Sequence, residues 1–173
     1  MPPSCPVPHR GFSLLELAVS LAVIAVFAGV LLQRLQFYQE AAEKARIELE
    51  VTKLKLALQA RIGAQIAEQR PVDFAAVARE NPMSWLDQPM TGYRGESGPA
   101  EARLVPPGSW YFDRDRLELV YLPVRDRYLA PDSTGRKRVR IKVEVLRARA
   151  GARKDDDAMH GLQLRLVETY RWF

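Results

Sequence analysis

The sequence predicts an α+β fold, in which one long N-terminal helix packs on a roughly four-stranded antiparallel sheet. No proline occurs between Pro8 and Pro71, and the residues between them keep a helical pattern of apolar side chains. Residues 109–173 instead contain short segments in which apolar and charged side chains alternate, as in half-buried strands. A helix with an apolar face that lies across such a sheet buries the apolar sides of both elements.

The composition indicates one small domain and one membrane-length segment. The 173 residues carry 26 basic and 21 acidic side chains, which gives a formal charge of +5. A basic balance of this size favours acidic partners only weakly and is not evidence for nucleic acid binding. Cys5 is the only cysteine, so the chain lacks the pair that a disulfide requires. Because the sequence has no zinc-binding, phosphate-loop or serine-hydrolase motif, we expect no cofactor and no catalytic residue.

The predicted helix begins with a run that is long enough to cross a bilayer. Residues 14–32 read LLELAVSLAVIAVFAGVLL, and Glu16 is their only charged residue. About 20 apolar residues span the hydrocarbon core, and a carboxylate within such a run indicates a functional site. Two compatible roles are open. Ser13 and Glu16 fit a capping box at the helix N-terminus, and the Glu16 carboxylate fits an ion pair with a cation of a neighbouring chain.

The residues around the start of this run resemble a known processing signal. Residues 11–16 read GFSLLE and lead directly into the apolar run, which resembles the leader of type IV pilins and type II secretion pseudopilins. The resemblance implies that prepilin peptidase cuts between Gly11 and Phe12 and that the new N-terminal Phe12 is methylated. It also implies that Glu16 pairs with the Phe12 amine of a neighbouring subunit, which sets the axial register of a fibre.

The same resemblance implies a pilin-like fold, a structural function and a set of partners. Those partners are other pilin or pseudopilin subunits, contacted through the N-terminal helix, together with prepilin peptidase and an inner-membrane assembly platform. The basic pair His9-Arg10 favours a cytoplasmic N-terminus and a periplasmic globular domain. The lack of a cysteine pair favours a minor pilin or a pseudopilin. Residues 80–96 and 107–124 resemble segments of minor pilins of the mannose-sensitive haemagglutinin type.

Three alternatives stay open at this point. The apolar run could belong to an ordinary secretory signal peptide, with Val26-Phe27-Ala28 as its cleavage site. Glu16 opposes this, as does the helical pattern that continues past Ala28. The other two alternatives are a membrane-anchored binding domain that does not polymerise and a DNA-uptake receptor.

Beyond the membrane run, the helix is expected to continue to Gln69 with two apolar faces. One face carries Ile47, Val51, Leu54, Leu58 and Ile62, and the nearly opposite face carries Ala45, Leu49, Leu56 and Ala60. We expect the first face to pack on the globular domain and the second on other helices. The alternative is a helix sunk deep in its own domain. Charged residues beside these faces are expected to be solvated, namely Glu43, Lys44, Glu48, Glu50, Lys53 and Lys55.

The remaining elements follow from local patterns. The expected divisions are a cleaved leader at 1–11, a transmembrane helix at 12–33, an amphipathic helix at 34–70, a connecting region at 71–108 and a sheet at 109–173. In the connecting region we expect a short helix that Asp73 caps, followed by the core anchors Trp85, Leu86, Met90 and Tyr93. In the sheet we expect a hairpin of 110–112 and 117–122, a strand at 138–145 with a charged outer face, and a last strand from Leu162 that continues to Tyr170 and Trp172.

Two further groups of residues are candidate binding sites. Asp155, Asp156 and Asp157 lie together and could coordinate Ca²⁺, although three consecutive aspartates in a loop are more typical of a solvated turn, and we expect no metal site. A basic face could meet nucleic acid phosphates, although it lacks the interleaved aromatic residues that stack on bases. Its members are Arg138, Arg140, Lys142 and Arg165.

Overall fold

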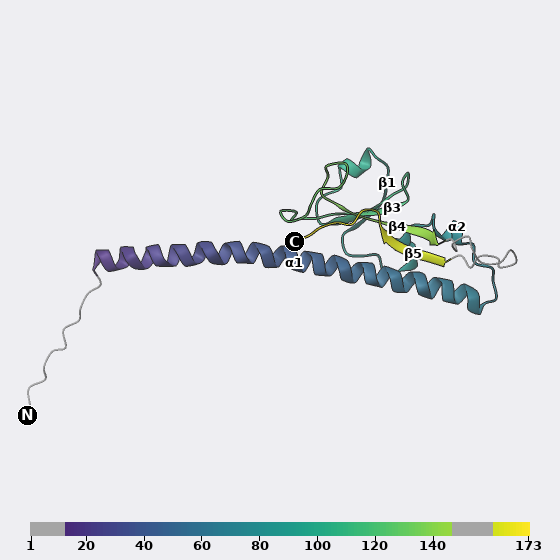
Figure 1. Ribbon diagram of the computed structural model, residues 1–173, viewed down its shortest axis with the longest axis horizontal. Coiled ribbons are helices and arrows are strands. Elements are labelled where there is room, and N and C mark those ends of the chain that lie inside the picture. Colours follow the sequence, from purple (N-terminus) through teal and green to yellow (C-terminus); the bar gives the residue numbers. More distant parts are fainter. Residues whose placement is uncertain (1–12, 147–160) are drawn as a thin grey trace, which may run out of the picture. The chain divides into compact units, whose positions relative to one another are not determined.

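The computed structural model describes residues 13–146 and 161–173, and it confirms the α+β, pilin-like fold class (Figure 1). The processing residues Gly11 and Phe12 and the acidic residues 155–157 lie outside the described residues. The chain divides into two compact units, Met1–Ala41 and Ala42–Phe173. The helices are α1 (Leu14–Ala67), α2 (Phe74–Val77), and the 3₁₀ helices η1 (Pro82–Trp85) and η2 (Glu101–Arg103).

Helix α1 ends where the backbone can no longer continue it. Arg70 precedes Pro71, which disfavours the helical conformation at Arg70. Gln69 adopts a left-handed φ of 54°, and the N–H groups of Gln69 and Arg70 donate to the carbonyls of Ile66 and Gln65 at 3.0 Å. These bonds satisfy two of the carbonyls that the end of a helix leaves free.

The sheet has five strands in the order β1-β2-β3-β4-β5. The strands are β1 (Tyr93–Ser97), β2 (Ser109–Asp113), β3 (Glu118–Leu122), β4 (Val139–Leu146) and β5 (Gly161–Leu166). Strands β2 to β5 pair antiparallel with their neighbours. Strand β1 pairs with β2 in parallel and has an irregular register. The predicted hairpin is therefore present as β2 and β3, and the predicted strand at 138–145 is present as β4.

Two features of the sheet differ from the prediction. Strand β1 lies in the segment expected to be a connection, because Arg94, Gly95 and Glu96 lack the apolar alternation that indicates a strand. The predicted extension of β5 to Tyr170 and Trp172 is wrong, since the strand ends at Leu166. Trp172 instead forms an isolated bridge with Leu129.

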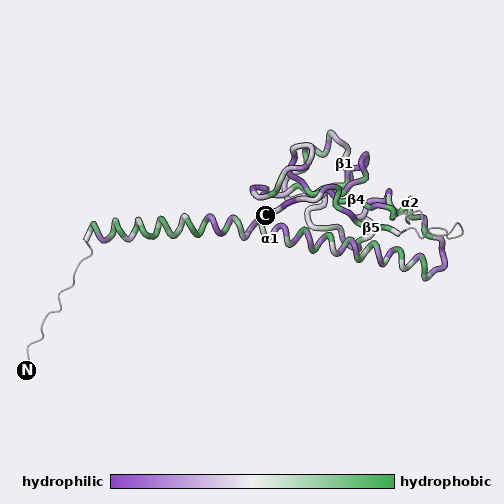
Figure 2. Tube along the Cα trace, viewed as in Figure 1, coloured by the Kyte–Doolittle hydropathy of each residue, from purple (hydrophilic) through white to green (hydrophobic). Residues whose placement is uncertain are grey.

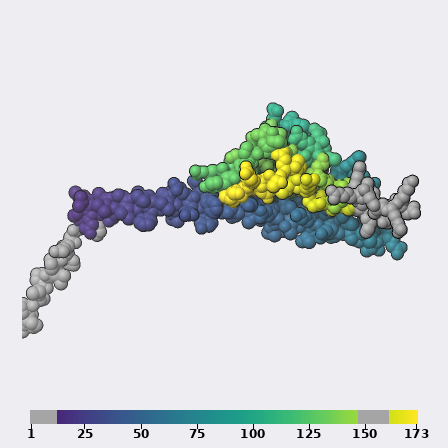
Figure 3. Space-filling model, in the orientation of Figure 1, coloured from purple at the N-terminus to yellow at the C-terminus, as the bar shows by residue number. Residues whose placement is uncertain are grey.

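The core of the second unit lies between the outer half of α1 and the sheet. On α1, Ile47 and Leu54 have no exposed area and Leu58 is 3% exposed. They join one buried cluster with strand residues that include Trp110 and Ile141. Figure 3 shows the yellow C-terminal residues packed along the blue outer half of α1. The first apolar face therefore packs on the globular domain, as predicted.

The connecting segment is held by short capping interactions. The Asp73 carboxylate accepts a hydrogen bond from the Ala76 N–H at 3.0 Å and caps α2, as predicted. Asn81 caps η1 by accepting from the Met83 N–H at 3.0 Å. The four predicted anchors all contact the core: Met90 is buried, and Trp85, Leu86 and Tyr93 are partly buried against it.

Candidate assembly surface

The first unit presents an apolar helix whose side chains are uncovered. In the part of the chain that the structure describes, α1 is the one helix with a window long and apolar enough to cross a membrane, and none of that window is buried. Leu14 is 86% exposed, Phe27 71% and Leu31 69%. Figure 2 shows this hydrophobic run in green along the first part of α1. Uncovered apolar surface of this extent is suited to lipid or to other helices.

Glu16 lies in the first turn of α1. The Ser13 hydroxyl accepts a hydrogen bond from the Glu16 N–H at 3.1 Å, which satisfies one of the free N–H groups at the helix start. The Glu16 side chain is exposed, and it forms no ion pair within residues 13–146 and 161–173. A carboxylate at the N-terminus of a helix is stabilised by the helix dipole, although in lipid it also needs a cation.

The second apolar face of α1 is exposed in the second unit. Leu49 is 57% exposed and Leu56 60%, and both Ala45 and Ala60 are exposed. The alternative of a helix sunk in its own domain required this face to be covered, so the structure contradicts it. An apolar stripe that none of residues 13–146 and 161–173 covers points to a contact outside the chain.

A groove continues this face toward the end of α1. It encloses about 780 Å³ and is open to solvent. Leu56, Ala60 and Ala64 of α1 form one wall, and Trp85 and Leu86 form part of the other. The α1 wall combines small alanines with long side chains such as Leu56, Arg61 and Gln65, so the groove is both apolar and polar.

Two of the helix carboxylates expected to be solvated are instead structural. Glu50 is 7% exposed and accepts a hydrogen bond from the Trp110 indole at 2.7 Å. Glu43 accepts from the Tyr121 hydroxyl at 2.7 Å and from the Val124 N–H at 2.8 Å. Burial, followed by the hydrogen bond and charge of Glu43, raises the pKa of Tyr121 above its usual range. The prediction failed because both residues lie within one helical turn of the buried face.

The basic strand face is also different from the prediction. Arg138 and Arg140 are each 9% exposed and form ion pairs with the carboxylates around them. Arg138 pairs with Asp132 at 2.8 Å, and Arg140 pairs with Glu118 at 3.5 Å and also with Glu168. These two guanidinium groups hold the loop before β4 and the segment after β5 against the sheet. They are therefore not available to nucleic acid phosphates.

Asp132 is the centre of this ionic cluster. Burial acts to raise its pKa, but hydrogen bonds from Thr134, Arg138 and the Arg136 N–H outweigh burial and hold the pKa well below the usual range. The Ser133 hydroxyl and N–H likewise lower the pKa of the Glu168 carboxyl. The cluster is thus a network of charges in which each buried carboxylate is satisfied.

The other two members of the basic face, Lys142 and Arg165, lie on neighbouring strands. Arg165 is exposed and pairs with Glu144 at 3.3 Å, and Lys142 is half-buried. Within the described residues, no group of three or more His, Cys, Asp or Glu side chains could hold a metal ion.

One comparison with known families gives a match. The model of the prokaryotic N-terminal methylation motif matches residues 8–32. These residues include Gly11, Phe12, Glu16 and the whole apolar run at 14–32. No curated protein and no solved structure matches the chain significantly.

Proposed function

We infer that this chain is a subunit of the type IV pilin and type II secretion pseudopilin family, which the N-terminal methylation motif at residues 8–32 supports. The family is structural rather than enzymatic. Within it, we propose a minor pilin-like subunit that is processed by prepilin peptidase and incorporated into a filament. The observation that carries the assembly function is the uncovered apolar face of α1 at Leu49 and Leu56.

Processing creates the groups that assembly uses. Cleavage between Gly11 and Phe12 frees the α-amino group of Phe12, four residues before Glu16 in the sequence. We propose that this amine pairs with the Glu16 carboxylate of a neighbouring subunit rather than with that of its own chain. Between staggered subunits they can meet, and the ion pair then fixes one axial register.

The apolar helix accounts both for membrane anchoring before assembly and for contacts between subunits after it. Before assembly, residues 14–32 lie in the inner membrane, with the globular domain on its periplasmic side. During assembly the helix leaves the lipid and packs on other helices, and this burial, worth roughly 25 cal/mol per Å² relative to exposure to water, offsets the loss of the lipid contact. The exposed face from Ala45 to Ala60 extends this contact beyond the membrane-length run. An anchored binding domain gives no reason for such a face.

Partners follow from this proposal. They are sister pilin or pseudopilin subunits, prepilin peptidase and the inner-membrane assembly platform. A type II secretion pseudopilin is the second candidate function, because the exposed helix face serves either filament. A DNA-uptake receptor is less well supported, since carboxylates already neutralise Arg138 and Arg140.

Replacement of Glu16 by Ala tests the assembly function. We expect the Glu16→Ala variant to enter the membrane and lose its leader normally, but to be absent from filaments. Intact mass of the membrane fraction measures leader cleavage and the added methyl group, and subunit content is measured in sheared filaments. Asp115→Ala is the matched control, because Asp115 is an exposed carboxylate in the turn between β2 and β3. Normal incorporation of Glu16→Ala would contradict the proposed ion pair.

A further inference from the structure

The loop after β3 and the C-terminal residues form an exposed surface of aromatic and basic side chains. We define the loop patch as Val124, Arg125, Arg127, Tyr128 and Phe173. Val124 is 57% exposed, Tyr128 41% and Phe173 50%, and both arginines are exposed. Large apolar side chains beside free cations are unusual on a water-facing surface and indicate a contact.

The backbone beneath the loop patch is well anchored. The Glu43 carboxylate accepts hydrogen bonds from the N–H groups of Val124 at 2.8 Å and Arg125 at 3.2 Å. Leu129 is 2% exposed and bridges to Trp172. The patch side chains are therefore presented outward from a fixed frame, so their exposure is a feature of the fold.

The rings and the cations of the loop patch are arranged together. The Tyr128 and Phe173 rings lie 5.3 Å apart. The Arg127 guanidinium lies 5.7 Å from the centre of the Tyr128 ring, and the Lys44 ammonium lies 5.8 Å from that of Phe173. The nearby Asp126 carboxylate pairs with Lys137 at 3.9 Å. Among the described residues, Arg125 and Arg127 form no ion pair, so the patch keeps two positive charges above the Glu43 carboxylate that binds the loop backbone.

The position of the loop patch along the chain limits its distance from the bilayer. Its frame contacts Glu43 and Lys44, which come about ten residues after the apolar run ends at Gln33-Arg34. Ten helical residues advance about 15 Å, whatever the angle of the helix to the membrane. The headgroup region of one leaflet is about 7 Å thick, and charges act over about 8 Å at physiological salt. The chain length between the apolar run and the residues that hold the patch therefore allows the patch to reach the headgroups.

We propose that the loop patch docks on anionic lipid headgroups of the bilayer that holds the apolar run. This proposal rests on the membrane anchoring in the proposed function. Aromatic side chains with polar tips favour the interface between lipid and water, and arginines near an anionic leaflet are attracted to its phosphates. Docking would hold the globular unit against the membrane before assembly and would be released when the subunit enters a fibre.

The test uses the full chain reconstituted in nanodiscs of phosphatidylcholine, with or without phosphatidylglycerol. Hydrogen exchange of residues 123–130 measures docking, because lipid contact slows exchange in proportion to the docked population. We expect slower exchange in the anionic discs only. Each cation near an anionic surface shifts the docked population about fivefold, so the double variant Arg125→Gln/Arg127→Gln should reduce the ratio of docked to free unit about 30-fold.

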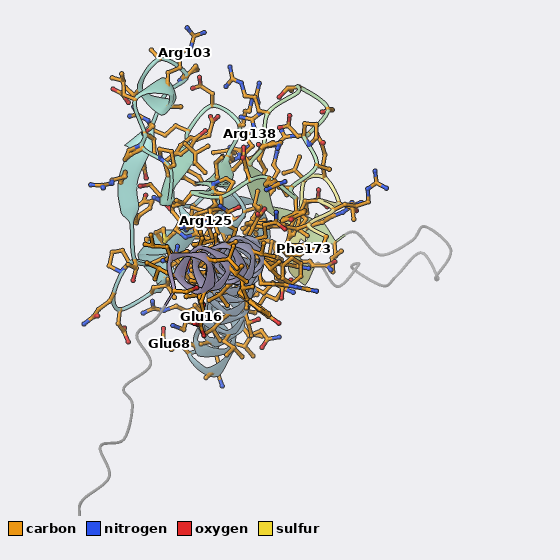
Figure 4. All side chains as sticks on the ribbon, turned by 90° about the vertical axis from the view of Figure 1, so that its left-hand side faces the viewer. Glu16, Glu68, Arg103, Arg125, Arg138 and Phe173 are labelled. Carbon is orange, nitrogen blue, oxygen red and sulfur yellow. The ribbon has the colours of Figure 1, made fainter. Side chains whose placement is uncertain are left out.

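A double variant with the same charge change is the control. Arg103 and Arg116 are both exposed, and Arg116 precedes β3 whereas the loop patch follows it, so the two lie at opposite ends of that strand. In Figure 4, Arg103 lies far from Arg125 and Phe173. We expect Arg103→Gln/Arg116→Gln to dock normally.

Three results would overturn the proposal, and they are distinguishable. Equal exchange in neutral and anionic discs, with the chain inserted, excludes docking but leaves the proposed function intact. If Arg103→Gln/Arg116→Gln lowers the ratio of docked to free unit as much as Arg125→Gln/Arg127→Gln does, the attraction is that of any basic protein to acidic lipid. If carbonate extracts the chain from membranes, the chain has not inserted, and this result contradicts the membrane anchoring itself.

Discussion

Replacement of two leucines on opposite faces of α1 separates folding from assembly. Leu54 has no exposed area, whereas Leu56 is 60% exposed. A buried Leu→Ala substitution lowers the free energy of unfolding by about 2–5 kcal/mol, because it removes apolar contacts and leaves a cavity. A substitution on an exposed face changes it by about 0.5 kcal/mol. We therefore expect Leu54→Ala to destabilise the domain and Leu56→Ala to leave it nearly as stable as the parent chain.

Urea unfolding of the full chain in detergent, followed by tryptophan fluorescence, measures both variants. Trp110 has no exposed area and Trp172 is 2% exposed, so both report loss of the core. With a slope of about 2 kcal/mol/M, the Leu54→Ala midpoint should fall by about 1–2.5 M. The Leu56→Ala midpoint should stay within about 0.3 M, while its incorporation into filaments falls. Equal destabilisation by the two substitutions would refute the assignment of the second face to assembly.

Two further predictions concern buried charges. The pKa of Asp132 in the folded chain lies below its usual value of 3.8, so its contribution to stability is present above about pH 4 and is lost as the pH falls further. Asp132→Asn should therefore weaken the acid dependence of the urea midpoint, and an unchanged dependence would contradict this. Glu50→Ala leaves the buried Trp110 indole N–H without its acceptor. It should therefore lower the free energy of unfolding by about 1–3 kcal/mol. Glu50→Gln keeps an acceptor for the indole N–H and should lower the free energy of unfolding by less. Thermal unfolding of the two variants measures this difference.

The sequence was most informative where one pattern dominates. The two faces of the outer helix could be predicted because a period of 3.6 residues leaves little freedom in which side chains share a face. The burial of Ile47, Leu54 and Leu58, and the exposure of Leu49 and Leu56, follow from that geometry. The hairpin and the strand at Val139 were predictable for the same reason, since their side chains alternate with a period of two.

Charged residues were predicted least well, because their burial depends on partners distant in the sequence. Arg138 and Arg140 alternate with apolar residues and therefore appear solvent-facing. Their burial requires Asp132 and Glu168, which come from two separate loops. Glu50 was missed in a similar way, although its position three residues after Ile47 places it beside the buried face and was a usable signal. Strand β1 could not be predicted, since its glycine and charges match a loop.

The loop patch, like the buried charges, could not be predicted from the sequence. Val124 and Tyr128 have no pattern of their own, and they become a surface only when β3, α1 and the C-terminal segment converge. The second apolar face of α1, in contrast, was evident from helical spacing alone, because all of its residues lie on one element.

Site-specific photo-crosslinking from the second face of α1 tests the central claim most directly. A photoreactive residue is placed at Leu49 or Leu56, and another at the exposed Arg103 as a control, in cells that assemble the filament. We predict that the two helix positions crosslink to a second subunit with the same kind of N-terminal helix and that Arg103 does not. If the helix positions crosslink no more than Arg103, or only to lipid, the face does not mediate assembly.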